Sequence, residues 1–301
     1  MSLRKVTTKK LIEKKRNGEK IVCITSYDYS FAKLVDESGI DLILVGDSLS
    51  MVMLGYPNTL SVTLDEMIHH TKAVTRAVSN ALVVGDMPFL TYKIDIKDAV
   101  YNAGRFIQEG NAEAVKIEGG TEICPVIRAM INADIEVMGH IGLTPQAIYR
   151  FGGFLVQGKT IDAAKKLIID AINLQNAGVF SIVLESIPWQ IAKIITEVVD
   201  VPTIGIGAGP HCDGQILVIH DMLGIFTEFK PKFLKYFGNI GKEIRSALQK
   251  YKEEVTSQIY PAQEHCYEYP SDDLNDLKNW LDSIDLEKEA KNLKNKLLNL
   301  K

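Results

Sequence analysis

The chain has 301 residues, of which 46% are hydrophobic and 24% are charged. This composition is close to the globular average and excludes a disordered or collagen-like chain, and no apolar run reaches the ~20 residues that a membrane span needs. The formal net charge of −4 argues against nucleic acid as a partner, because binding along phosphates requires a basic surface. The N-terminus lacks the apolar core of a secretory signal. The cysteines are scattered without a CxxC pair, which favours a reducing cytoplasm over a disulfide framework.

Short apolar runs rich in Val and Ile recur along the chain, and each is closed by a glycine or a polar residue. Continuous apolarity is typical of strands that are buried on both faces, as in a parallel sheet covered by helices. We expect eight strands, at residues 21–28, 42–48, 81–88, 114–119, 135–142, 180–187, 202–209 and 215–221.

Stretches with helical spacing lie between most of these runs. One of them begins with Thr63 and Glu66, whose spacing is that of a capping box. We expect helices at residues 30–38, 64–79, 96–108, 122–132, 161–176 and 189–199. Eight strand–helix units predict a (β/α)8 barrel, a TIM barrel, rather than an open sheet. The glycine-rich residues 205–209 do not match the GxGxxG fingerprint of the open alternative.

The chain continues beyond the eighth predicted strand. Residues 242–256 have the pattern of an amphipathic helix, and residues 267–301 carry an apolar stripe among many charges, as one helix or two joined near Asp285. This stripe either docks on its own barrel or packs onto a neighbouring subunit. We expect a barrel catalytic domain at residues 1–265 and a charged helical extension at residues 266–301.

Ionisable residues stand at the ends of most of the predicted strands, where the active site of a TIM barrel lies. Burying a carboxylate costs several kcal/mol unless it is paired or metal-bound, so this pattern indicates a site rather than packing. The residues are Asp28, Asp47, Asp86, Glu118, His140, Glu185 and Asp221.

Asp47, Asp86 and Glu118 end the second, third and fourth strands and should converge. Oxygen ligands without nearby Cys favour Mg²⁺ or a similar ion, although each acid alone could instead cap the following helix. Lys116 points out of its strand on the same side as Glu118 and could hold an anionic substrate.

His140 ends the fifth strand, as a site residue or as a hydrogen-bonded core histidine. Glu185 ends the strongly apolar sixth strand, across the barrel from the predicted metal. Burial in this position would disfavour the charged form of the acid, which suits a general base working near neutral pH.

An ordered set of motifs resembles one known family. The motifs are TSYD (25–28), LVGDS (44–48), LGY (54–56), TLSVT (59–63), GDMPF (85–89), VKIEGG (115–120), MGHIGLTPQ (138–146), GIGAG (205–209) and QILVIHDMLG (215–224). They run in order from about residue 5 to residue 265, and together they resemble the ketopantoate hydroxymethyltransferase family.

The resemblance implies a TIM-barrel enzyme of pantothenate biosynthesis that uses one Mg²⁺ per subunit. It would transfer a hydroxymethyl group from 5,10-methylenetetrahydrofolate to 3-methyl-2-oxobutanoate (α-ketoisovalerate) and so form ketopantoate. By motif, Glu185 is the catalytic base. The metal residues are Asp47, Asp86 and Glu118, and the substrate-binding residues are Asp47, Ser48, Asp86, Lys116 and His140.

The resemblance also implies a cytoplasmic homo-oligomer, commonly a decamer of two pentameric rings. Residues 267–301 extend beyond the expected end of typical members, so the assembly is less firmly implied than the chemistry. Two other functions remain open at this point. One is a Mg²⁺-dependent oxo-acid lyase or mutase of the phosphoenolpyruvate mutase and isocitrate lyase type. The other is a barrel that binds a metabolite without catalysis.

Overall fold

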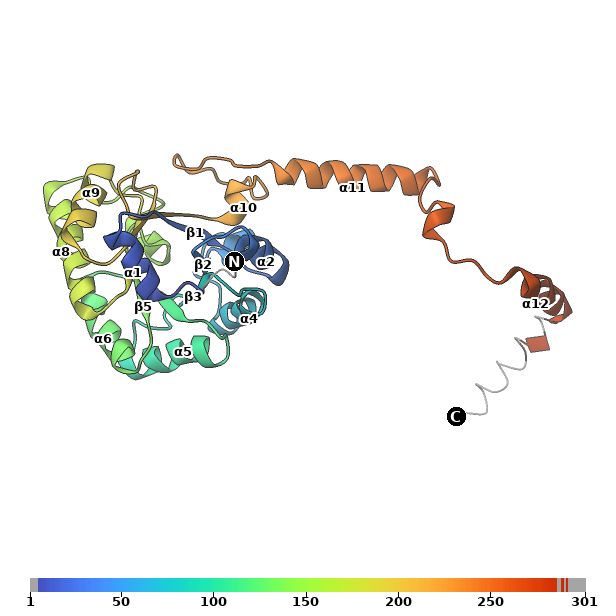
Figure 1. Ribbon diagram of the computed structural model, residues 1–301, viewed down its shortest axis with the longest axis horizontal. Coiled ribbons are helices and arrows are strands. Elements are labelled where there is room, and N and C mark those ends of the chain that lie inside the picture. The colour runs from blue at the N-terminus through green and yellow to red at the C-terminus, as the bar shows by residue number, and fades with distance from the viewer. Residues whose placement is uncertain (1–4, 286–287, 290, 292–301) are drawn as a thin grey trace. The chain divides into compact units, whose positions relative to one another are not determined.

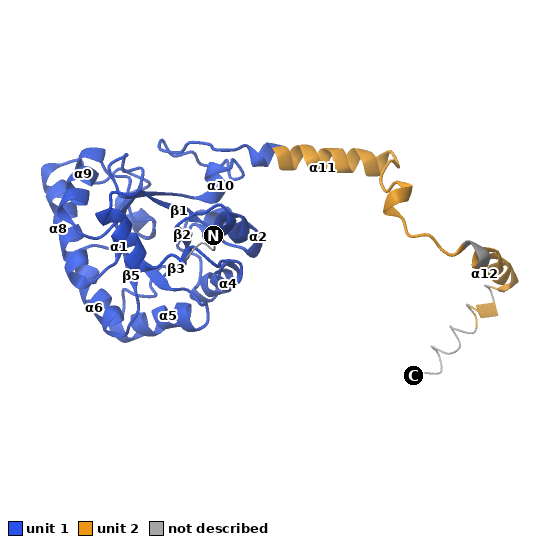
Figure 2. Cartoon of the chain, in the orientation of Figure 1, with its two compact units in different colours: residues 1–242 blue, residues 243–301 orange. Residues whose placement is uncertain are grey.

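The structure is a computed structural model that describes residues 5–285, 288, 289 and 291 (Figure 1). The chain divides into two compact units, residues 1–242 and residues 243–301 (Figure 2). We expected the barrel domain to extend to residue 265, and that boundary stays a prediction. Within the described residues, no helix combines the length and the apolarity needed to cross a membrane.

Eight parallel strands close into a barrel in chain order, as predicted. β5 ends at Gly142 as predicted, and the other strands end one to four residues before the predicted runs, because the last residues of those runs leave the sheet. The strands are β1 (Ile21–Thr25), β2 (Leu42–Val45), β3 (Leu82–Asp86), β4 (Ala114–Glu118), β5 (Val137–Gly142), β6 (Ser181–Glu185), β7 (Thr203–Ile206) and β8 (Gly214–Leu217).

The predicted helices surround this barrel (Figure 1). Thr63 and Glu66 form the predicted capping box, with the Thr63 backbone N–H donating to Glu66 Oε2 at 2.7 Å. The six helices are α2 (Tyr29–Glu37), α4 (Leu64–Thr75), α5 (Ile96–Gln108), α6 (Cys124–Asn132), α8 (Ile161–Ala177) and α9 (Trp189–Val198).

Two of these helices differ from the prediction by two or more residues at one end. α4 stops at Thr75 rather than at residue 79. The segment before α6 is a separate 3-10 turn, η1 (Thr121–Ile123), and Pro125 lies in the first turn of α6 itself. Short elements that the sequence did not predict complete the unit: α1 (Thr8–Arg16), α3 (Leu49–Val52), η2 (Pro145–Ala147), α7 (Ile148–Phe151) and α10 (Ile219–Met222).

The helix α1 closes the end of the barrel where the strands begin. Its Leu11 is fully buried among side chains that point into the barrel. Lys14 pairs with Asp41, which precedes β2, at 2.6 Å, and Lys15 pairs with Asp213, which precedes β8, at 2.9 Å. The site is therefore confined to the opposite end, where the strands finish.

The inward-facing positions change character along the strands. Alternate residues of a strand point to the same face, and the inner cluster contains Val84, Ala114, Met138 and Val183. Two residues further along the same face, in the direction of the carboxyl ends, stand Asp86, Lys116, His140 and Glu185. The barrel interior is therefore apolar where the strands begin and is lined by ionisable side chains at their carboxyl ends.

The second unit is helical and mostly exposed. The predicted amphipathic helix at 242–256 is found as α11 (Ile240–Thr256), whose exposed apolar residues are Ile244, Leu248, Tyr251 and Val255. After η3 (Gln263–His265), α12 (Ser271–Ser283) ends two residues before Asp285, which agrees with the alternative of two helices joined near that residue. The last leucines of the predicted stripe, Leu293, Leu297 and Leu300, lie outside the described residues.

Candidate active site

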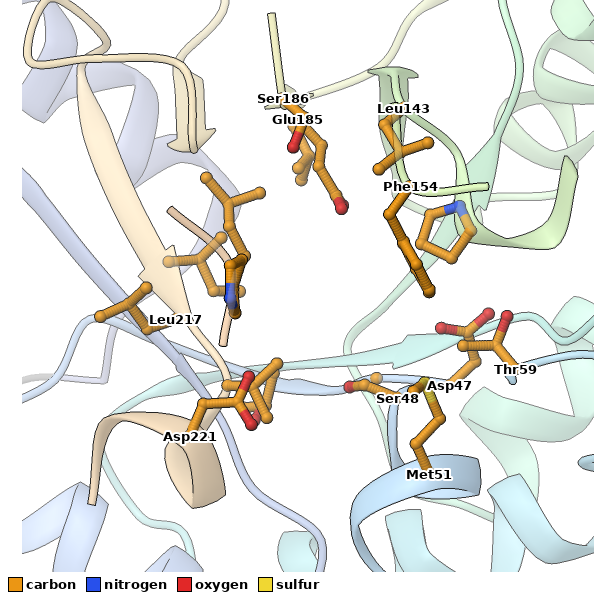
Figure 3. Close-up of a pocket in the computed structure, with 18 of the residues that line it drawn as sticks. Asp47, Ser48, Met51, Thr59, Leu143, Phe154, Glu185, Ser186, Leu217 and Asp221 are labelled. Carbon is orange, nitrogen blue, oxygen red and sulfur yellow. The ribbon is translucent and has the colours of Figure 1, made fainter. Parts of the chain in front are cut away.

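A cavity of about 420 Å³ opens at the carboxyl ends of the strands (Figure 3). It lies within the first unit, and its volume is in the range of sites that bind small molecules. The seven residues to which the family resemblance assigns a role all line it: Asp47, Ser48, Asp86, Lys116, Glu118, His140 and Glu185. Asp221, another acid at the end of a predicted strand, also lines it. Asp28 does not, because its carboxylate caps α2 by accepting from the Phe31 backbone N–H at 2.9 Å.

Lys116 and Asp86 form a buried ion pair on neighbouring strands. The Lys116 Nζ donates to Asp86 Oδ1 at 2.7 Å and to Oδ2 at 2.8 Å. Burial acts to lower the pKa of Lys116, but the charges of Asp86, Glu118 and Asp47 outweigh burial and raise it. Lys116 therefore stays charged at neutral pH, as a buried lysine does only beside several carboxylates.

Asp47 follows β2 and lies next to this pair. Its backbone N–H donates to Asp86 Oδ2 at 3.1 Å. Burial raises the pKa of Asp47 well above its usual value, and the nearby charges of Asp86 and Glu118 raise it further. The positive charge of Lys116 therefore does not balance the negative charges of Asp47, Asp86 and Glu118 at this end of the cavity.

Gln146 holds this cluster together, although it carries no ionisable group that would mark it in the sequence. Its Nε2 donates to Asp47 Oδ2 at 2.9 Å, and its backbone N–H donates to Glu118 Oε2 at 3.1 Å. The Tyr92 hydroxyl donates to Gln146 Oε1 at 2.7 Å. Gln146 lies in η2, directly after Pro145, so the TPQ motif that follows β5 was the available signal.

His140 lies between two glutamates on the inner face of the barrel. Its Nδ1 is 3.5 Å from Glu118 Oε1, and its Nε2 is 3.2 Å from Glu185 Oε2. Burial and the charge of Lys116 act to lower the pKa of His140, but its contacts with Glu118 and Glu185 outweigh them and raise it to about 9. The raised pKa favours the imidazolium form of His140 at neutral pH. The ring lies between the acid cluster and Glu185, and neither of its nitrogens has a hydrogen-bond partner among the described residues.

Glu185 and Ser48 present polar atoms to the cavity from opposite sides (Figure 3). Glu185 is the last residue of β6, and its side chain is 15% exposed. Ser48 follows β2, and its Oγ is 2.8 Å from the buried Tyr27 hydroxyl. Tyr27 was not selected from the sequence, because a tyrosine inside an apolar run is indistinguishable from core.

Two of the three clustered acids, Asp47 and Asp86, are better placed to bind a cation than all three together with Glu118. Among the described residues, no group of three or more His, Cys, Asp or Glu side chains has an arrangement that could hold a metal ion. Glu118 is engaged by the Gln146 N–H and faces His140 and Lys116. Asp47 and Asp86 are adjacent and buried, and burial together with the charge of Glu118 raises the pKa of both carboxyls even though Lys116 pairs with Asp86. Neighbouring buried carboxyls of this kind are the chemistry of a divalent-cation site.

Comparisons with known proteins agree with this geometry. The family model described as ketopantoate hydroxymethyltransferase matches residues 5–263. The 3-methyl-2-oxobutanoate hydroxymethyltransferase of Clostridium botulinum (strain 657 / Type Ba4) is 60% identical over 265 residues, covering 88% of this chain and 96% of the relative. The enzyme of the same name from Syntrophomonas wolfei is 59% identical over 263 residues, covering 87% and 95%.

Two solved structures with a similar barrel are distant from this chain in sequence. A phosphonopyruvate hydrolase in complex with oxalate and Mg²⁺ has a TM-score of 0.57 at 12% identity, covering 91% of this chain and 95% of that one. A 2,3-dimethylmalate lyase has a TM-score of 0.56 at 16% identity, covering 94% and 98%. At such identity the likeness concerns the fold alone. The assignment therefore follows the far more similar transferases, and not the lyase and mutase alternative. The chain belongs to the ketopantoate hydroxymethyltransferase family of enzymes.

Proposed function

We propose that this hydroxymethyltransferase converts 3-methyl-2-oxobutanoate to ketopantoate in pantothenate biosynthesis, with 5,10-methylenetetrahydrofolate as the one-carbon donor and Mg²⁺ as the metal. The observation that carries the proposal is the division of charge around the cavity. Asp47 and Asp86, two carboxyls whose pKa values are raised by burial, lie beside Lys116, and on the other side of the cavity Glu185 lies 3.2 Å from the His140 ring.

The oxo acid is proposed to bind at the Asp47 side of the cavity. Lys116 supplies positive charge for its carboxylate, and the Ser48 hydroxyl supplies a hydrogen bond. Asp47 and Asp86 would hold Mg²⁺, with Glu118 as the third acid of the cluster. When bound, the metal supplies electrophilic stabilisation of negative charge on the 2-oxo oxygen. Gln146 keeps Asp47 oriented toward the cavity.

Glu185 is the proposed base that removes the proton from C3 of the oxo acid. Its Oε2 lies 3.2 Å from His140 Nε2 at the edge of the cavity, and a carboxylate oxygen placed there can accept the proton. The deprotonated C3 then attacks the methylene carbon of the folate. A new C3–CH₂ bond forms, both bonds from that carbon to N5 and N10 of the folate break, and one water supplies the hydroxyl group of the product. The proton from C3 and the second proton of this water end on the two folate nitrogens, which leaves tetrahydrofolate.

Two further properties are proposed from the family resemblance. One is assembly into a homo-oligomer, with a decamer as the expected state, which sedimentation can measure. The other is a cytoplasmic location, which accords with four cysteines that are all free of disulfides.

The proposed function is tested by supplying the protein with 3-methyl-2-oxobutanoate and 5,10-methylenetetrahydrofolate labelled with ¹³C at the methylene carbon. Mass spectrometry should find the label in ketopantoate when Mg²⁺ is present, and no product when the metal is chelated. Unlabelled cleavage products from the oxo acid alone would instead favour a lyase. Binding of the oxo acid without any product would favour the non-catalytic barrel.

A further inference from the structure

Asp221 is an unpaired acid on the wall of the cavity that faces Asp47 and Ser48 (Figure 3). It lies on α10, which follows β8, and its Oδ1 is buried and has no hydrogen-bond partner among the residues that the structure describes. Burial raises the pKa of Asp221 to about 6. A buried oxygen without a donor is costly for the fold, so this carboxyl is better explained by a ligand that brings donors than by packing.

The wall around Asp221 is aromatic. Phe226, Phe229 and Phe233 line the cavity within the segment that follows α10, and the Phe229 ring lies 5.3 Å from that of Phe154. Phe233 lies against Gly207, where a Cβ would come within 2.5 Å of the phenyl ring. The glycine at 207 thus gives Phe233 its place on this wall. Such a surface suits a flat, partly apolar ring system.

Positive charge completes this side of the cavity. Lys230 and Lys232 line it in the same segment as the phenylalanines. The oxo acid is a small anion, so an ionised Asp221 would repel it, and the cluster at Lys116 offers it a better site. The ligand that suits Asp221 has adjacent N–H donors, a flat ring and a negatively charged end.

We propose that Asp221 binds the pterin of the folate donor, accepting hydrogen bonds from its 2-amino group and its N3–H. These two donors lie side by side and match a carboxylate as a guanidinium does. The phenylalanine wall contacts the fused rings, and Lys230 and Lys232 attract the glutamate carboxylates of the tail. The assignment rests on the proposed function, because it takes a reduced folate to be the co-substrate.

The test compares tetrahydrofolate with its 2-desamino analogue, which lacks one of the two donors. Dissociation constants are measured by calorimetry under anaerobic conditions for the wild type, Asp221→Asn, Asp221→Leu and Glu228→Gln. The last is the matched control, since Glu228 is an exposed acid in the same segment and does not line the cavity.

The wild type and Glu228→Gln should prefer tetrahydrofolate by about 10- to 100-fold, the range of a charge-assisted hydrogen bond. Asp221→Leu should lose this preference, and Asp221→Asn should retain only part of it. The comparison of the two ligands on the wild-type protein requires no variant. The proposal can therefore still be tested if Asp221→Leu folds poorly.

Failure of this assignment can be separated from failure of the proposed function. If the wild type makes labelled ketopantoate but binds the two ligands equally, the pterin does not contact Asp221, and the proposed function stands. A preference that persists in a folded Asp221→Leu overturns the assignment in the same way. If the wild type neither binds tetrahydrofolate nor makes the product, both proposals are overturned.

Discussion

Replacing Lys116 with methionine removes the ammonium group while keeping an unbranched side chain of similar length. In the native structure the ammonium contacts both oxygens of Asp86, and the two side chains are only 4% and 2% exposed. Removing one partner of a buried ion pair costs about 3–5 kcal/mol, because the remaining charge stays buried without compensation. We therefore expect Lys116→Met to lower the free energy of unfolding by about this amount at neutral pH.

The measurement is urea unfolding followed by circular dichroism, in the presence of a chelator and again in excess Mg²⁺. Lys193→Met is the matched control, since Lys193 and Glu197 are 3.8 Å apart with side chains 49% and 63% exposed. Such an exposed pair is worth about 0.5 kcal/mol or less. If Asp47 and Asp86 hold the metal, Mg²⁺ should restore more stability to Lys116→Met than it adds to the wild type.

A loss below about 1 kcal/mol in Lys116→Met would refute this reasoning, because the pair would then behave as an exposed one. Equal losses in Lys116→Met and Lys193→Met would do the same. If Lys116→Met loses stability by the expected amount and Mg²⁺ does not change that loss, the buried ion pair is supported. The same result would contradict the proposal that Asp47 and Asp86 hold the metal.

Three further predictions concern other parts of the cavity. His140 has a raised pKa of about 9, so its charge stabilises the fold fully below about pH 6.5 and this stabilisation is lost as the pH rises through about 9. His140→Gln should therefore cost more stability at pH 6 than at pH 10 in thermal unfolding, and a constant cost would contradict the ion contacts. Asp221 has a raised pKa of about 6, so its ionisation costs stability that grows from about pH 4 to pH 6. Asp221→Asn should be more stable than the wild type by about 1 kcal/mol at pH 8, after discounting for partial exposure, and should show no gain at pH 3.5. Gln146→Met removes the donor to Asp47 and should raise the Mg²⁺ concentration needed for half-maximal activity about tenfold. An unchanged metal requirement would argue that Gln146 does not orient this ligand.

The barrel could be predicted from the sequence because strands buried on both faces leave a local signal. Residues 42–45 and 82–86 are apolar almost without interruption, and the helices between the strands carry their own caps, as at Thr63. The ends of the strands were less certain. An acid that follows an apolar run can line the cavity, as Asp47 does, or cap a helix, as Asp28 does. The acid that lines the cavity and the acid that caps a helix differ only in where the following helix begins.

The site was only partly predictable, because some of its contacts join residues that are distant in sequence. Gln146 binds Asp47, which is 99 residues away. A neutral amide after a strand has no periodic or charge pattern that would mark this role. The spacing of the glycines at 205–209 indicates only that they are not a dinucleotide motif, whereas in the structure Gly207 leaves room for Phe233. That requirement depends on the packing of a loop 26 residues further along the chain.

The central claim is that Glu185 removes the C3 proton of the oxo acid beside a metal held at Asp47 and Asp86. Its most direct test is NMR of 3-methyl-2-oxobutanoate in D₂O with the enzyme and no folate. With Mg²⁺ the C3 proton should exchange for deuterium, with a chelator exchange should stop, and with Glu185→Gln it should fall to the background rate. Exchange that persists in Glu185→Gln at the wild-type rate would contradict this assignment of the base.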